Sequence, residues 1–348
     1  MNRTVPAEAV HAVTAAHRHG VRRVRVVSLL LAAAMVVVFG ASLAVGDFTV
    51  GLPDLVRILT GSGTGRAVYV VTELRLPRAV CALLVGIAFG LAGALFQRLL
   101  RNPLASPDVV GVTSGAAAAG VTCLVVFGAS GALVSAGALA GGVLTAAVIY
   151  LLAWRRGMNG YRLVLVGIGV AAVLSSVISF LMTWADVQLA QQALVWLTGN
   201  LNGRGWEHVQ PLALCLAVLV PAALLLGRTL AALQLGDDSA RGIGVAVERG
   251  RLGVILVGVA LASLATAAAG PVAFVAFVAN PIATRLVGGA RPSLVPAALT
   301  GALVTLTGDF AAAHLLGTTQ LPVGVVTGAV GAPYLLLLLA RANRAGRI

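Results

Sequence analysis

The sequence predicts an all-α integral membrane protein that crosses the bilayer with about ten helices. Of its 348 residues, 59% are hydrophobic and only 10% are charged, and mean hydropathy is +1.00. A soluble domain is closer to half apolar and a quarter charged. Because so few charges cannot cover a water-facing surface, we expect lipid to form part of the solvent of this chain. The 42 glycines suit close packing between membrane helices.

Apolar stretches of spanning length follow one another along the chain, since a helix needs roughly 20 apolar residues to cross the hydrocarbon core. They cover residues 26–46, 79–97, 109–127, 132–153, 163–183, 209–227, 252–269, 272–287, 294–316 and 323–340. The eighth is short and follows Gly270-Pro271, so it need not cross fully. We expect one transmembrane domain over 26–340, between a basic flank at 1–25 and a basic tail at 341–348.

The arginines predict the orientation. Net charge is +13, there is no lysine, and with a cytoplasmic N-terminus most arginines fall in cytoplasmic segments. Those expected outside are Arg57, Arg66, Arg75, Arg78 and Arg204. Both termini are therefore expected in the cytoplasm of a multi-pass protein of the cytoplasmic membrane. Basic loops facing anionic lipid explain the high pI better than a nucleic-acid partner does. The apolar run after Arg22-Arg23 is long enough to span, which favours an uncleaved first helix over a signal peptide.

Several chemistries are excluded or disfavoured. A phosphate-binding loop needs a lysine, so the chain is not by itself a standard P-loop ATPase. No catalytic Ser-His-Asp or Cys-His set is evident, so no enzyme activity is predicted. The cysteines, at 81, 123 and 215, are far apart within apolar runs and predict no metal site. A metal-binding role for His11, His17 and His19 stays open beside the reading of a solvated, disordered flank.

Ion coupling is also disfavoured. Proton-coupled carriers usually hold ionisable groups at mid-membrane. Here the nearest candidates, Asp309 and His314, fall toward the outer end of the ninth apolar stretch. Sodium coupling through backbone carbonyls remains open.

Two segments with charged residues and prolines flank the second apolar stretch. Leu74 to Arg78 places Arg75 and Arg78 around a proline at the outer mouth, where they present cations to whatever docks outside. Residues 97–115 contain a turn expected on the cytoplasmic side, with Ser106-Pro107-Asp108 as a helix cap. The residues of this turn are Arg101, Asn102, Pro103, Ser106 and Pro107.

Two more lie later in the chain. Residues 235–251 form the longest cytoplasmic loop, where Asp237-Asp238-Ser239 offers an N-cap and Gly242 and Gly244 offer a helix end and a turn. This predicts a short exposed helix that a soluble partner could grip, although an ordinary linker is the alternative. Residues 320–328 weaken the last helix, which suits a transport path or tight packing equally well. Pro322, Gly324 and Thr327 are the pathway candidates.

Together these segments resemble the FecCD-type permeases, the membrane subunits of ABC importers for ferric siderophores, haem and vitamin B12. The matching residues are Arg75-Leu76-Pro77-Arg78; Gly93-Ala94-Leu95-Phe96-Gln97; Arg101-Asn102-Pro103-Leu104-Ala105-Ser106-Pro107; Gly111-Val112-Thr113-Ser114-Gly115; Leu235-Gly236 with Ala240-Arg241-Gly242-Ile243-Gly244; Gly270-Pro271; and Leu321-Pro322-Val323-Gly324. They follow the family order from about residue 26 to 340. Leu194 to Asn200 looks like the siderophore branch, especially iron–catecholate permeases.

The resemblance implies a type II ABC importer permease fold and a permease dimer, with itself or with a paralogue. It also implies two cytoplasmic ABC ATPases that carry ATP and Mg, an extracytoplasmic substrate-binding protein and a ferric-siderophore substrate. The loop at 235–249 would couple to the ATPase through Leu235, Gly236, Ala240, Arg241, Gly242 and Gly244. Arg75 and Arg78 would dock acidic residues of the binding protein. No cofactor or metal is expected on this chain itself.

The sequence departs from the family pattern in two places. Pro281-Ile282 replaces the usual Pro-His before Arg285, so the role of that histidine does not transfer. Ala313, beside His314, stands where many members have an arginine, which puts part of the outer docking set in doubt. The alternatives are a vitamin B12 or haem importer permease, an ion-coupled secondary transporter and a non-transporting membrane scaffold.

Overall fold

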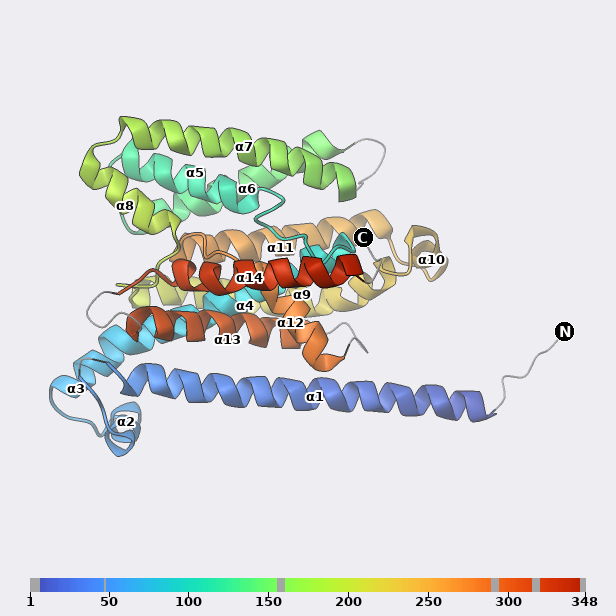
Figure 1. The fold of residues 1–348 in the computed structure, drawn as a ribbon, viewed down its shortest axis with the longest axis horizontal. Coiled ribbons are helices and arrows are strands. Elements are labelled where there is room, and N and C mark those ends of the chain that lie inside the picture. Colours follow the sequence, from blue (N-terminus) through green and yellow to red (C-terminus); the bar gives the residue numbers. More distant parts are fainter. Residues whose placement is uncertain (1–6, 47, 155–159, 289–293, 315–319, 345–348) are drawn as a thin grey trace.

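A computed structural model describes residues 7–46, 48–154, 160–288, 294–314 and 320–344, and these ranges contain helices and no strands. The long helices lie roughly side by side (Figure 1). They are α1 (Ala7–Ala44), α4 (Leu76–Leu99), α5 (Val112–Val125), α6 (Ala132–Ala153), α7 (Gly160–Trp184), α9 (Trp206–Leu233), α11 (Val247–Ala269), α12 (Val275–Val287), α13 (Leu294–His314) and α14 (Val323–Arg344). Each coincides with one of the ten predicted stretches, which confirms the all-α membrane fold.

Eight of the helical segments in these ranges are long and apolar enough to cross a membrane, whereas α5 and α12 are shorter. The eighth predicted stretch is thus short, as expected. The first helix is longer than expected, because α1 starts at Ala7, within the segment predicted to be a disordered flank. Residues 7–19 are rich in alanine and contain no glycine or proline, so nothing in them interrupts a helix.

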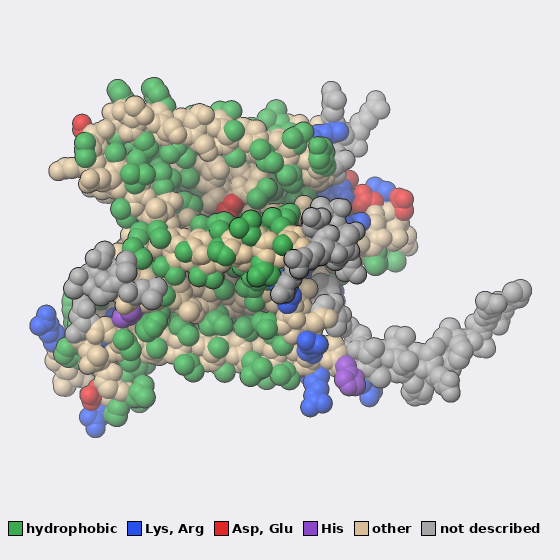
Figure 2. All heavy atoms as spheres, in the orientation of Figure 1, with side chains coloured by type: hydrophobic (Ala, Val, Ile, Leu, Met, Phe, Trp, Pro, Cys, Tyr) green, Lys and Arg blue, Asp and Glu red, His purple; other side chains and the backbone are tan. Residues whose placement is uncertain are grey.

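Short helices mark the two ends of the bundle. Helices α2 (Leu52–Leu59), α3 (Arg66–Tyr69) and a π-helical turn (Val70–Arg75) lie at one end, called the α2 end, with α8 (Val187–Leu197). Helix α10 (Asp237–Gly242) lies at the opposite end, called the α10 end, which is also the end at which α1 starts (Figure 1). Hydrophobic side chains cover the flanks of the bundle and most charged ones gather at its ends (Figure 2), as membrane burial requires.

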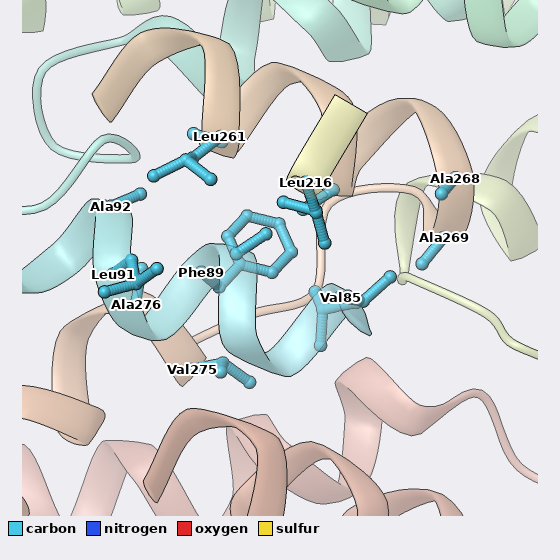
Figure 3. Close-up of a cluster of buried hydrophobic side chains, with 14 of the residues drawn as sticks. Val85, Phe89, Leu91, Ala92, Leu216, Leu261, Ala268, Ala269, Val275 and Ala276 are labelled. Atoms are coloured by element: carbon cyan, nitrogen blue, oxygen red, sulfur yellow. The ribbon is translucent and has the colours of Figure 1, made fainter. Parts of the chain in front are cut away.

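Helix α4 is the centre of the core. It packs against α9, α11, α12 and α13. Figure 3 shows Phe89 of α4 among apolar side chains from several of these helices. Glycine permits the closest approaches: a Cβ at Gly86 would lie 2.5 Å from the carbonyl oxygen of Gly301, and one at Gly93 only 1.7 Å from that of Ala276. Backbone therefore rests directly on backbone, as in small-residue membrane interfaces.

The other layer consists of α5, α6, α7 and α8, with α5 and α6 packed on α11. Helix α5 starts only at Val112, because Gly111 before it takes a left-handed conformation (φ +90°). The predicted cap at Ser106-Pro107-Asp108 is therefore wrong. The Asp108 carboxylate instead accepts a hydrogen bond from the Thr113 hydroxyl.

A non-helical break separates α11 from α12. Gly270 (φ +75°) ends α11, and Phe274 takes a left-handed conformation (φ +64°) just before α12 begins. Left-handed phenylalanine is unusual and persists only where the surroundings hold it. Backbone that leaves the helix at membrane depth must be buried in protein or line a cavity.

Candidate functional site

The predicted docking arginines line a cavity of about 890 Å³ at the α2 end. Arg75 closes the π-helical turn, and Arg78 follows in the first turn of α4, which Pro77 helps to start. Arg66 and His314 also line the cavity, together with Asp309 and Gln320. Most of the ionisable groups around it are basic, so an acidic surface would be complementary.

Arg78 is held by a buried carboxylate. Its Nε lies 2.9 Å from Oδ2 of Asp309 and its NH2 lies 2.9 Å from Oδ1, which makes a bidentate pair between α4 and α13. NH1 also donates to Oε1 of Gln320 at 3.1 Å. The exposed fractions of the two side chains are only 18% for Arg78 and 8% for Asp309. Bidentate pairing fixes orientation as well as adding energy.

Arg75 closes the end of the first helix. Its NH1 donates to the carbonyl of Leu43 at 2.8 Å, and its NH2 donates to that of Phe48 at 2.6 Å. The last carbonyls of a helix lack intrahelical partners and carry partial negative charge, so a guanidinium stabilises them. Both arginines thus lie at the α2 end with partners inside their own chain, and docking of a second protein stays a prediction.

The predicted short helix exists as α10. It follows Gly236 (φ +107°), which stands at the N-cap, so the predicted side-chain cap from Asp237-Asp238-Ser239 is wrong. The end of the helix at Gly242 and the turn at Gly244 (φ +82°) are confirmed. The two aspartates instead occupy the first turn, where negative charge favours the helix dipole.

Helix α10 is anchored to the bundle by one small residue and by one ion pair to α11. Ala240 is fully buried in a cluster with Leu233 and Val247. Arg251 of α11 donates to Asp237 at 2.9 Å, and the exposed Arg241 pairs with Asp238 at 3.1 Å. This arrangement leaves Leu235 and Ile243 exposed at 67% and 63%. A fixed helix with an apolar fringe at the end of the bundle is a surface that a partner can hold.

The turn after α4 contacts the C-terminal end of α9, shortly before α10 begins. Arg101, itself left-handed (φ +49°), donates from NH2 to the carbonyl of Leu233 at 2.5 Å. Asn102 accepts the backbone N–H of Leu104 at 2.9 Å, and the buried Ser106 accepts that of Val109 at 3.3 Å. Pro103 and Pro107 lie within the same turn. Arg101 also lines one pocket with Asp237 and Arg251, so the structure brings together two predicted segments that sequence reasoning had treated separately.

The start of α14 is held by close packing. The N–H of Gly324 donates to the carbonyl of Gly199 at 3.1 Å, and a Cβ at Gly324 would come within 1.8 Å of the Thr198 carbonyl oxygen. Pro322 stands just before the helix. Thr327 is buried and lines an apolar cavity of about 330 Å³ between α12, α13 and α14. Packing accounts for Gly324, while the cavity keeps Thr327 a candidate for the pathway.

Sequence reasoning missed a buried polar network. Gln97 donates to the carbonyl of Phe277 at 2.9 Å and accepts from Asn280 at 2.8 Å, and Arg98 donates to Asn280 at 2.9 Å. All three polar side chains are buried. They tie α4 to the short α12 below its break. The available signal was Asn280, an isolated amide in an otherwise apolar run.

The cysteines and histidines form no metal site within the described residues. No group of three His, Cys, Asp or Glu side chains there could hold a metal ion. The described cysteines are unpaired, from buried Cys81 to exposed Cys215. The side chains of His11 and His17 lie outside the described residues.

Comparison with known proteins shows which proteins have this architecture. A solved structure described as an inward-facing conformation of a putative metal-chelate type ABC transporter superposes with a TM-score of 0.78 at 26% identity, covering 90% of this chain and 98% of that one. The ferric enterobactin transport system permease protein FepG of Escherichia coli (strain K12) is 43% identical over 93% of this chain and 98% of its own length.

A second relative, the achromobactin transport system permease protein CbrC of Dickeya dadantii (strain 3937), is 39% identical over 92% of each chain. The family model described as the FecCD transport family matches residues 25–341, which is nearly the whole chain. The chain therefore belongs to the FecCD transport family.

Proposed function

We propose that this chain is the membrane-spanning permease subunit of an ABC importer that moves a ferric siderophore across the cytoplasmic membrane. The observation that carries the proposal is the 43% identity to a ferric enterobactin permease over nearly the full length of both chains. The chain has no lysine for a phosphate-binding loop, so ATP and Mg belong on separate ATPase subunits.

Helix α10 is the proposed seat for the ATPase. Its buried Ala240 and its link to Arg251 fix it to α9 and α11, while Leu235 and Ile243 face outward. The Arg101–Leu233 contact connects the same region to α4 through the turn at 101–107. A movement of the ATPase would then reach α4, α9 and α11 together. Transport requires that the partner favour one arrangement of these helices over the other.

The α2 end is the proposed face for the substrate-binding protein. The cavity lined by Arg66, Arg75 and Arg78 offers positive charge to acidic residues. Because Arg78 already holds Asp309, an arriving carboxylate would join an existing network and compete for its donors. If the α2 end faces the extracytoplasmic side, both termini face the cytoplasm. A second permease subunit, either a copy or a paralogue, completes the passage.

The test is reconstitution of the complete importer in proteoliposomes with iron-labelled ferric siderophore. We expect uptake that needs ATP, the binding protein and a hydrolysis-competent ATPase. Uptake by the permease alone, driven by an ion gradient, would instead establish the secondary-transporter alternative. Vitamin B12 or haem in place of the siderophore tests the other importer substrates. A scaffold would leave uptake intact when α10 is disrupted.

A further inference from the structure

A polar cavity of about 600 Å³ lies at the α2 end beside α8, apart from the cavity of Arg75 and Arg78. Helix α8 occupies this end of the bundle, between α7 and α9 in the chain (Figure 1). Three glutamines, at 188, 191 and 192, recur at helical spacing on its exposed face and line the cavity. Asn200 and Arg204 supply the other polar groups.

The lining has a definite chemistry. Carboxamides both donate and accept hydrogen bonds, and guanidinium donates through a planar fork. Arg204 is the one ionised side chain among these lining residues, so the cavity carries net positive charge and no acidic group. Within the described part of the chain, none of the three glutamine side chains has a hydrogen-bond partner. A ligand that presents many oxygen acceptors and negative charge fits this lining best.

Arg204 is positioned by its own neighbours. Its Nε donates to the carbonyl of Asn200 at 3.4 Å, and NH1 lies 2.8 Å from Nε2 of His208. Burial lowers the pKa of the Arg204 guanidinium, with the charge of nearby Glu207 acting in the opposite direction. Burying a cation costs free energy, and an anion bound beside it would offset that cost.

The cavity lies beside the point where the segment after α8 contacts the α11–α12 break and the start of α14. The backbone N–H of Asn200 donates to the carbonyl of Ala269 at 2.7 Å, at the break between α11 and α12. The neighbouring Gly199 accepts the N–H of Gly324 at the start of α14. A ligand held at Asn200 and Arg204 thus lies next to both helix ends.

We infer that Gln188, Gln191, Gln192, Asn200 and Arg204 form an entry subsite for an anionic, oxygen-rich ferric chelate. The inference rests on the proposed function and adds a place of first contact within the permease. The amides contact the oxygen-rich rim of the chelate, and Arg204 contributes the charge. Selection at this subsite favours ferric catecholates, which are anionic, over ferric tris-hydroxamates, which are neutral.

The experiment uses the complete importer in proteoliposomes and compares three variants with wild type. The first combines Q188L, Q191L and Q192L, and the second is R204Q. The third, Q210L, is the matched control, because it removes an exposed glutamine of α9 outside the cavity. Uptake of iron-labelled ferric enterobactin is measured against the concentration of loaded binding protein. ATP hydrolysis stimulated by the empty binding protein reports assembly and docking.

We expect the half-saturating concentration to rise about tenfold in R204Q and in the triple variant, as loss of charge-assisted or multiple hydrogen bonds implies. Q210L should match wild type, and stimulated ATP hydrolysis should be unchanged in all three. If the importer does not assemble with R204Q, the triple variant alone tests the subsite, because it alters only exposed side chains. Wild-type kinetics in the triple variant would overturn the subsite. Absence of wild-type uptake would instead defeat the proposed function.

Discussion

The Arg78–Asp309 pair predicts a measurable thermodynamic coupling between α4 and α13. Both side chains are mostly buried, and the carboxylate is the deeper of the two at 8% exposure. Removing one partner of a buried pair costs about 3 kcal/mol or more, because it leaves an uncompensated charge. We therefore expect R78L and D309L each to destabilise the protein by about that amount, with R78L the more severe since it strands the deeper charge.

The double variant R78L/D309L provides the decisive comparison. Replacing a buried ion pair with apolar residues is often neutral or stabilising, so the double variant should regain most of the lost stability. The assay is a double-mutant cycle on thermal inactivation in detergent, followed by the fraction of monodisperse protein after heating. Losses that simply add would refute the reasoning, since additivity means that the two side chains do not interact.

The same variants separate positioning from docking. If Arg78 serves only to hold α13, R78L/D309L should restore binding-protein-dependent transport along with stability. If Arg78 also contacts the binding protein, stability should return while stimulated ATP hydrolysis stays low. The readout is ATP hydrolysis by the reconstituted importer against the concentration of binding protein.

Three further predictions concern the core and the α10 end. Q97L should destabilise the protein by about 2 kcal/mol, because it leaves the buried hydrogen-bond partners of the amide unpaired. The exposed control Q210L should stay within about 0.5 kcal/mol of wild type, and thermal inactivation measures both. G93A should abolish folded protein on size-exclusion chromatography, because its Cβ would meet backbone, whereas G40A, with nothing within 4 Å, should be tolerated or slightly stabilising. L235D should weaken co-purification of the ATPase about tenfold at unchanged thermal stability; full co-purification would exclude this surface from the interface.

Continuous apolar stretches in the sequence predicted the helices, and local patterns predicted their ends less well. Apolar runs placed every long helix because lipid demands continuous apolar stretches. The two predicted caps, at Ser106–Asp108 and Asp237–Ser239, were wrong for one reason: a glycine with positive φ, Gly111 or Gly236, stands at the actual N-cap. Cap preference is a weak local term, and the conformation of a neighbouring glycine outweighs it.

Long-range partners lay beyond sequence reasoning altogether. Arg78 and Asp309 are 231 positions apart, and Arg101 and Leu233 are 132 apart. Nothing in periodicity or composition pairs residues at such separations. The resemblance indicated that Arg78 and the 235–249 loop matter, but only the packing of α4 against α13 and α9 gives each a specific neighbour.

The glycine contacts of α4 have a mechanical consequence. Where Gly86 and Gly93 meet the main chain of α13 and α12, no side chain stands between the helices that could rotate or yield. Because these contacts cannot be partly relaxed by a side-chain movement, the helices either stay in contact or separate. The central helices should therefore shift together as one rigid unit. The movement that a bulky cargo needs should fall to a peripheral helix without such contacts, such as α1, where a Cβ at Gly40 would meet nothing within 4 Å.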